Sequence, residues 1–303
     1  MELKIAIVGG GVAGLSAAIY ALRANADVTI FEQYGLGGLT ASLDKIENFP
    51  SYTNVEGWQL ADNMVNQAQA LGLKTVYEQV VDIRKTDKGF DIITSENTYN
   101  FLSVIIATGT KHNKLGIEGD FIGRGVSYCA TCDGNFYRKR PVTVAGNGNS
   151  AVNEALYLSN IASEVHVINP ADTFNADEIL VNRLTSSENV KVHYNCTVTA
   201  LNGEDKLQSI TVLDNDGKHE IPTDALFVAV GAQPALDFLR SLSVEKDKAY
   251  IKADDHMQTS VEGLFVCGDV SNGPLKQIVT ACADGAKAGH YASAYCRKVS
   301  RGK

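Results

Sequence analysis

The chain carries one strand–glycine loop–helix–strand pattern twice. The first copy covers residues 4–32 and the second covers residues 141–169. Their glycine loops, 9–14 and 146–151, follow short runs rich in Val, Ile and Ala and precede helical patterns rich in Ala and Leu. The two loops are offset by 137 residues (146 minus 9). The repeat predicts an α/β protein with two Rossmann-like dinucleotide-binding domains of the three-layer ββα type.

The first glycine loop reads Gly9-x-Gly11-x-x-Gly14, and an acid, Glu32, follows the second strand. Glycines at these positions allow a tight turn, close approach of a diphosphate and close packing of helix on strand. An acid at position 32 accepts hydrogen bonds from an adenosine ribose and repels a 2′-phosphate. The loop therefore predicts a site for FAD or NAD rather than NADP. The alternative is a glycine turn without a ligand.

The second loop reads Gly146-x-Gly148-x-x-Ala151, but Asn169 stands where the first copy has its acid. Residues 170–175 contain no arginine or lysine that could pair with a 2′-phosphate. The loop is expected to bind NAD(P)H weakly, to bind another dinucleotide such as a second FAD, or to have no ligand. The candidate residues are Gly146, Gly148, Asn149, Ser150, Ala151 and Asn169.

Two of the six cysteines are close in sequence, in the segment Cys129-Ala-Thr-Cys132-Asp133-Gly134. The C-x-x-C spacing permits an easily reduced disulfide and lowers the pKa of the attacking thiol. Asp133 could give or take a proton during exchange. Half of a zinc site and two unrelated core cysteines are the alternatives. We expect no metal, because the remaining cysteines are isolated.

Composition narrows the class of protein. The chain has 303 residues, a length typical of two domains, and a net charge of −8, which argues against a nucleic-acid-binding protein. It has no apolar run of eighteen residues, and its N-terminus lacks the pattern of a signal peptide. We therefore expect a cytoplasmic protein that is not inserted in a membrane.

Together these motifs resemble the low-molecular-weight, bacterial-type thioredoxin reductases, which are FAD-containing disulfide reductases. The resemblance covers nearly the full length. It is carried by residues 9–14, Gly37-Gly38, 46–50, 107–109, 124–127 with the adjoining Cys129–Gly134 segment, 268–270 and 276–278.

The resemblance implies that the second domain is inserted in the first. Residues 1–112 and 243–303 would form a discontinuous FAD-binding domain, and residues 113–242 a central domain of pyridine-nucleotide type that carries the redox disulfide. The implied FAD-binding residues are Gly9, Gly11, Ala13, Gly14, Glu32, Gln33, Gly38, Leu39, Asn48, Ala107, Thr108, Gly109, Gly268, Asp269, Lys276, Gln277 and Ile278.

The resemblance also implies the chemistry. Electrons would pass from a donor to FAD, then to the Cys129–Cys132 disulfide, and then to a thioredoxin-like protein. Cys129 would attack the partner, Cys132 would face the flavin, and Asp133 would exchange a proton. Members of the family form homodimers and rotate one domain against the other.

The chain departs from the family at the nucleotide site. NADPH-dependent members have His-Arg-Arg and a further Arg where this chain has Asn169, Pro170, Ala171 and Asn175. We therefore expect a donor other than ordinary NADPH, such as ferredoxin or a second flavin or dinucleotide. The alternatives are a flavin dithiol oxidase that uses oxygen, an ordinary NAD(P)H-dependent reductase with an unusual nucleotide site, and a non-catalytic flavin-binding protein.

Overall fold

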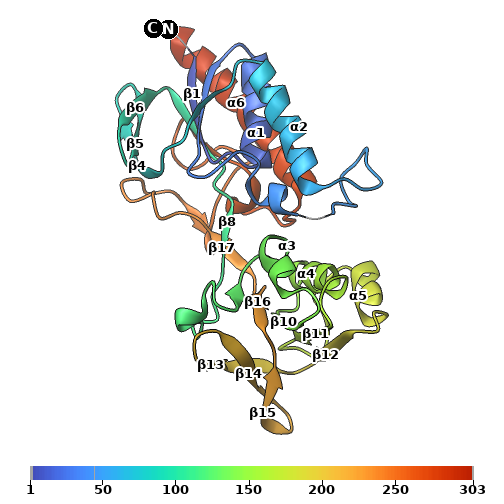
Figure 1. Cartoon of the computed structure of the whole chain (residues 1–303). Helices are drawn as coiled ribbons and strands as arrows, with labels where there is room; N and C mark the ends of the chain where they lie inside the picture. The colour runs from blue at the N-terminus through green and yellow to red at the C-terminus, as the bar shows by residue number, and fades with distance from the viewer. Residues whose placement is uncertain (1–2, 44, 302–303) are drawn as a thin grey trace. The chain divides into compact units, whose positions relative to one another are not determined.

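The computed structural model describes residues 3–43 and 45–301. The chain forms two compact units (Figure 1). Unit 1 contains Met1–Lys111 and Gln233–Lys303, and unit 2 contains His112–Ala232. Short strands β8 (Thr110–His112) and β17 (Ala232–Pro234) lie at the two places where the chain passes from one unit to the other.

Unit 1 is built on a five-stranded parallel sheet in the order β20-β7-β1-β2-β3. Side chains of β1 alternate between two cores: Ile5 and Ile7 pack with the helices, and Ala6 and Val8 pack on the opposite side. The strands are β1 (Lys4–Val8), β2 (Asp27–Phe31), β3 (Lys74–Val76), β7 (Ser103–Ile106) and β20 (Leu264–Val266).

Helices cover one face of this sheet, and a small antiparallel sheet covers the other (Figure 1). The helices are α1 (Val12–Arg23), α2 (Gly57–Ala70) and α6 (Ile278–Arg301), and the antiparallel strands are β4 (Val80–Thr86), β5 (Gly89–Thr94) and β6 (Thr98–Phe101). Phe90 and Ile92 of β5 are buried against the parallel sheet. Unit 1 therefore has the predicted three-layer ββα architecture.

Unit 2 repeats this architecture with the sheet order β12-β11-β10-β16-β9. Its parallel strands are β9 (Val126–Ser127), β10 (Pro141–Ala145), β11 (Glu164–Ile168), β12 (Val190–His193) and β16 (Ala225–Val228). Its helices are α3 (Ala130–Asp133), α4 (Asn149–Ser159) and α5 (Glu178–Thr185), and its antiparallel strands are β13 (Thr197–Gly203), β14 (Leu207–Asp214) and β15 (Gly217–Pro222).

The two copies of the sequence repeat also form equivalent backbone hydrogen bonds. The N–H of Gly9 donates to the carbonyl of Phe31 at 2.9 Å, and the N–H of Gly146 donates to the carbonyl of Ile168 at 3.0 Å. Both the donors and the acceptors are 137 residues apart (146 minus 9 and 168 minus 31). The two predicted Rossmann-like folds are confirmed.

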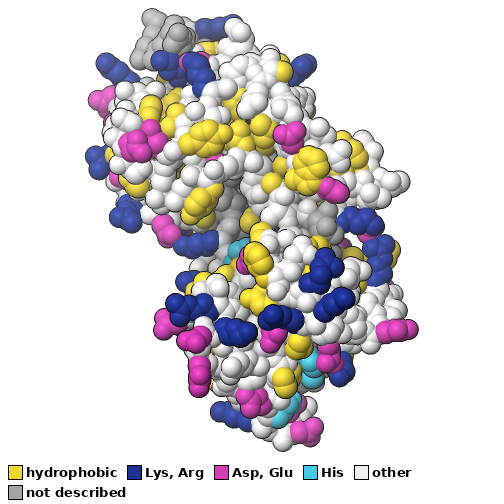
Figure 2. Space-filling view, in the orientation of Figure 1, with side chains coloured by type: hydrophobic (Ala, Val, Ile, Leu, Met, Phe, Trp, Pro, Cys, Tyr) yellow, Lys and Arg dark blue, Asp and Glu magenta, His cyan; other side chains and the backbone are white. Residues whose placement is uncertain are grey.

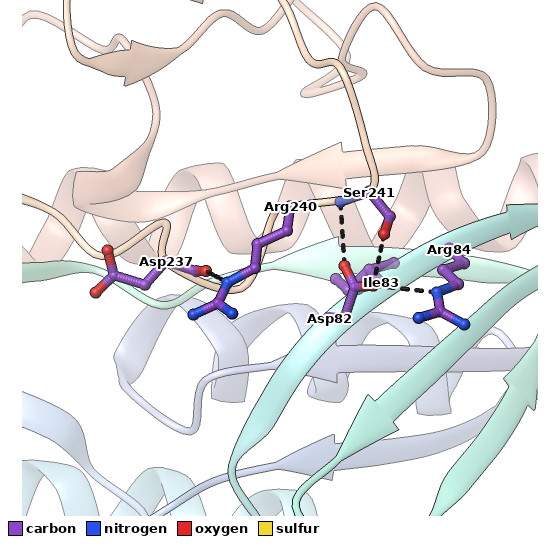
Figure 3. A network of polar contacts seen from close by, with 6 residues as sticks. All are labelled: Asp82, Ile83, Arg84, Asp237, Arg240 and Ser241. Carbon is purple, nitrogen blue, oxygen red and sulfur yellow. Dashed lines mark hydrogen bonds and ion pairs between the residues drawn. The ribbon is translucent and has the colours of Figure 1, made fainter.

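Residues 233–242 pack in unit 1, although the sequence placed them in the central domain. Asp82 on β4 accepts hydrogen bonds from the backbone N–H of Ser241 at 3.2 Å and from its hydroxyl at 2.6 Å (Figure 3). Phe238 is buried with Ile83 in the core between the two sheets. The structure therefore places the division at residues 232 and 233 instead of 242 and 243.

None of the helices among residues 3–43 and 45–301 is both long enough and apolar enough to span a membrane.

Candidate functional site

The glycines of the first loop have two different roles. A Cβ on Gly9 would lie 2.4 Å from the carbonyl oxygen of Ala107, and a Cβ on Gly14 would lie 2.1 Å from the carbonyl oxygen of Gly9. These two glycines are required by packing within the fold. Gly11 is open, because the nearest atom to a Cβ there is the Cα of Gly38, at 3.9 Å. A ligand can therefore approach the backbone at Gly11.

The N-terminus of α1 is suited to an anion. Gly11 is its N-cap residue, no side chain caps the helix, and its first turn contains no acid. The first N–H groups of a helix have no partner within it and carry a partial positive charge. The predicted Gly268–Asp269 segment adjoins this end, since a Cβ on Gly268 would lie 2.8 Å from Cβ of Ala13. These residues fit the diphosphate of the FAD that the resemblance implies.

Glu32 is fixed beside the same loop. Its Oε2 accepts the N–H of Gly10 at 2.8 Å, and its Oε1 accepts the N–H groups of Gln33 at 2.8 Å and Tyr34 at 3.0 Å. A carboxylate has about four acceptor positions. Three are used by the backbone, so the geometry leaves capacity for one ribose hydroxyl.

A second group of predicted residues meets at the start of α6. The Nδ2 of Asn48 donates to Oε1 of Gln277 at 3.0 Å, although 229 residues separate them in sequence. Lys276 donates to the carbonyl of Ser271, and its Nζ lies 4.5 Å from the ring centroid of Tyr250. The cation–π contact with Tyr250 has no signal in the sequence.

The charges of two acids, Asp269 and Asp284, act on the Lys276 ammonium. Burial raises the pKa of Asp269, and Lys276 partly offsets this effect. Burial also raises the pKa of Asp284 on α6, and the charge of Lys287, the N–H of Gly268 and the charge of Lys276 oppose that rise. Burial lowers the pKa of Lys276. Asp284 was not predicted, because nothing in the sequence of α6 indicates that this acid contacts the loop at Gly268.

Three predicted residues have more ordinary surroundings. The Thr108 hydroxyl donates to the carbonyl of Ala235 at 2.9 Å, so it holds the returning chain within unit 1. Leu39 is 53% exposed on the 3₁₀ helix Gly38–Ser42. Gly109 has a φ of +61°, a conformation that favours glycine.

In unit 2, Cys129 and Cys132 form a disulfide, with Cα atoms 5.3 Å apart. Cys129 is the N-cap residue of α3, and its Sγ accepts the backbone N–H of Cys132 at 3.2 Å. Cys132 is exposed and Cys129 is half-buried. The described residues contain no cluster of three or more His, Cys, Asp or Glu side chains that could hold a metal ion.

Ser127 organises the redox turn, and no role for it was predicted from the sequence. Its hydroxyl donates to Oδ2 of Asp133 at 2.7 Å and accepts the N–H of Cys129 at 3.1 Å. The N–H of Asp133 donates to the carbonyl of Cys129 at 3.2 Å. The carboxylate of Asp133 is thus held at a fixed place beside the disulfide.

The second glycine loop has the shape of the first. A Cβ on Gly146 would lie 2.2 Å from the carbonyl oxygen of Ala229, whereas Gly148 is open, with Asn175 O as its nearest atom at 3.8 Å. Gly148 is the N-cap residue of α4. Asn149 accepts the N–H of Asp177 at 2.7 Å, Ser150 is exposed and Ala151 is buried.

Asn169 differs from its counterpart Glu32 in what it contacts. It is fully buried. Its Oδ1 accepts the N–H of Ala171 at 2.9 Å, and its Nδ2 donates to the carbonyl of Thr173 at 3.1 Å. The Asn169 side chain therefore forms hydrogen bonds within residues 169–173 and none to the glycine loop 146–151.

Comparison with known proteins supports one family. A family model for pyridine nucleotide-disulphide oxidoreductases matches residues 3–285. A thioredoxin reductase from Treponema pallidum is 42% identical over 300 residues, which covers 97% of each chain. The crystal structure of Lactococcus lactis thioredoxin reductase in its FR conformation is 33% identical, with a TM-score of 0.95, and the match covers 98% of this chain and 100% of that one.

A second solved structure is less similar in sequence. A ferredoxin-flavin thioredoxin reductase from Clostridium acetobutylicum is 27% identical, with a TM-score of 0.56, and the match covers 99% of each chain. The family model and the curated relative match nearly the whole chain. The chain belongs to the pyridine nucleotide-disulphide oxidoreductases and, within them, to the low-molecular-weight, bacterial-type thioredoxin reductases.

Proposed function

We propose that the protein is an FAD-dependent reductase of thioredoxin-like protein disulfides and that its electron donor is not ordinary NADPH. The observation that carries the proposal is the Cys129–Cys132 disulfide, whose cysteines are half-buried and exposed respectively, so that neither is enclosed in the core. The open glycine loop at Gly11 and the anion-binding end of α1 support FAD as the cofactor. When bound, FAD would supply the two electrons that reduce this disulfide.

Residues of this chain perform the exchange with the partner. Reduction of the disulfide yields two thiols. In the role that the resemblance assigns to it, the Cys129 thiolate attacks the partner's disulfide and forms a mixed disulfide, which the Cys132 thiolate then breaks. The partner receives two electrons and two protons, and the Cys129–Cys132 bond forms again. Asp133, whose carboxylate accepts the Ser127 hydroxyl, would exchange a proton with the sulfurs.

The proposed change of donor rests on the second nucleotide loop. The side chain of Asn169 is fully buried and its hydrogen bonds stay within its own loop, which argues against a bond to a ribose hydroxyl. Residues 169–178 contain Asp172, Asp177 and Glu178 but no lysine or arginine. A 2′-phosphate there would meet negative charge and have no cationic partner. We favour ferredoxin as the donor, because one structural relative is named a ferredoxin-flavin thioredoxin reductase. A second flavin or dinucleotide is the other candidate.

Turnover with an artificial reductant tests the disulfide chemistry without assuming the natural donor. Reduced viologen should drive formation of thioredoxin thiols by the wild-type holoenzyme. Cys132→Ser should abolish it, and Cys282→Ser, at a half-buried cysteine in unit 1, should not. Full turnover by Cys132→Ser would contradict the proposal. Rapid oxygen consumption with a small dithiol, without reduction of thioredoxin, would favour the dithiol oxidase. Homodimer assembly and a cytoplasmic location remain predictions.

A further inference from the structure

Tyr128, the residue before Cys129, is held on two sides. Its hydroxyl donates to Oε1 of Glu118 at 2.8 Å. Its ring stacks on the imidazole of His112, with centroids 6.0 Å apart and an interplanar angle of 28°. Together they fix the backbone at the entrance of the redox turn.

Glu118 is the centre of this arrangement. It is 3% exposed, and its carboxylate also accepts the N–H groups of Leu115 at 2.6 Å and Gly116 at 2.7 Å. Burial by itself raises the pKa of Glu118, but the hydrogen bonds outweigh burial and the pKa is lowered. Burial and the bond to Glu118 raise the pKa of Tyr128 to about 12. The pair is therefore a carboxylate and a neutral phenol at physiological pH.

The partners of Tyr128 lie on the segment by which the chain enters unit 2. That unit begins at His112, and Glu118 ties the backbone of residues 115–116 to the phenol. On the other side of Tyr128, Ser127 belongs to β9 and binds the N–H of Cys129. Cys129 is thus fixed both to the sheet and to the entering segment.

We propose that Glu118 and Tyr128 are positioning residues for the redox disulfide: their hydrogen bond fixes Cys129 to the segment 112–118 and thereby sets the equilibrium between disulfide and dithiol. The inference rests on the proposed redox role of the pair. A disulfide is more stable when its thiols have a high effective concentration relative to each other. Release of Tyr128 lets Cys129 move away from Cys132, so the dithiol is favoured.

Equilibration with a reference dithiol measures this effect directly. The holoenzyme is incubated with mixtures of reduced and oxidised dithiothreitol, and the thiols of the Cys129–Cys132 peptide are counted by alkylation and mass spectrometry. In this reaction the enzyme's S–S bond breaks, the reference compound gains an S–S bond, and two electrons and two protons pass to the enzyme. We expect Tyr128→Phe and Glu118→Gln each to shift the equilibrium about three- to tenfold toward the dithiol.

The matched control is Tyr99→Phe. Tyr99 is a partly buried tyrosine of unit 1 whose hydroxyl donates to Oε1 of Glu78 at 2.9 Å, so the variant breaks the same kind of hydrogen bond in the other unit. It should leave the equilibrium unchanged. The Glu118→Gln/Tyr128→Phe double variant should shift it no further than the larger single change, because both remove one interaction.

Three results would overturn the proposal. They are an unchanged equilibrium in Tyr128→Phe, an equal shift in Tyr99→Phe, and additive shifts in the double variant. A purely structural role would lower the melting temperature of Tyr128→Phe without moving the equilibrium. Loss of turnover in Cys132→Ser together with an unchanged equilibrium in Tyr128→Phe would reject this inference alone. Full turnover in Cys132→Ser would reject the proposed function.

Discussion

The carboxylate of Asp82 accepts two hydrogen bonds from Ser241, one from the backbone N–H and one from the hydroxyl (Figure 3). Asp82 lies on β4 of the small sheet, and Ser241 lies on the chain that has returned from unit 2. Asp82 also accepts the N–H of Ile83 at 3.0 Å and Nε of Arg84 at 3.1 Å. One buried carboxylate thus attaches the returning segment to unit 1.

Asp82→Asn should destabilise unit 1 by about 1–3 kcal/mol at pH 7, because an amide offers one acceptor oxygen in place of two. Burial raises the pKa of Asp82, but the hydrogen bonds led by Ser241 outweigh burial and lower it. The stabilisation is therefore complete above the unfolded pKa, near 3.8, and is lost as pH falls through the lower folded value. Urea unfolding at pH 7 and pH 3 should show a smaller difference between wild type and variant at pH 3 than at pH 7. An equal difference at both values would contradict this account.

Glu154 on α4 should make unit 2 less stable as the pH rises. Its Oε2 is buried without a hydrogen-bond partner among the described residues, and burial raises its pKa to about 8. Between the unfolded value, near 4.5, and about pH 8, only the folded protein holds this proton. The free energy of unfolding should fall by about 1.4 kcal/mol for each pH unit in that interval.

Glu154→Gln removes this titration and keeps the shape of the side chain. The variant should resemble wild type near pH 4 and exceed it in stability at pH 8, as measured by urea unfolding across the pH range. Asn153→Asp, at the exposed neighbouring position, is the control and should keep the wild-type slope. Equal pH slopes in wild type and Glu154→Gln would show that Glu154 is not a buried, raised-pKa acid.

Gly11→Ala should remove the flavin and leave the fold intact. The Cβ would meet no protein atom closer than 3.9 Å, and it would occupy the open side of the loop, where a diphosphate approaches. Gly148→Ala makes the same change in the second loop, with the nearest atom at 3.8 Å. Flavin content after denaturation should fall severalfold in Gly11→Ala and stay at the wild-type level in Gly148→Ala. Equal flavin content in wild type, Gly11→Ala and Gly148→Ala would show that the first loop is not the FAD site.

The sequence predicted the parts of the molecule that local patterns encode. The repeated glycine loops predicted two Rossmann-like folds, and the spacing of Cys129 and Cys132 permitted the disulfide. Both signals lie within a few residues, so they can be found without knowledge of the fold. Glu32 was also predicted, because it follows a strand at a fixed distance from the loop.

Two features that depend on contacts between distant parts of the sequence were not predicted. Asp284 reaches the Gly268 loop from a helix, and no local pattern distinguishes it from an ordinary surface acid. The predicted boundary between the two units, after residue 242, differs from the observed one, after residue 232, for a similar reason. Residues 233–242 look like a continuation of the central domain until Asp82 and Ser241 are seen in contact. Asn169 was recognised as a departure, but the bonds that commit it to its own loop required the structure.

Anaerobic mixing of the oxidised holoenzyme with NADPH in a stopped-flow spectrophotometer tests the central claim most directly. If the disulfide chemistry is retained while the 2′-phosphate site is lost, micromolar NADPH should leave the flavin absorbance unchanged over seconds, whereas reduced viologen should bleach the flavin and yield thioredoxin thiols. Bleaching of the flavin within seconds by micromolar NADPH would contradict this prediction.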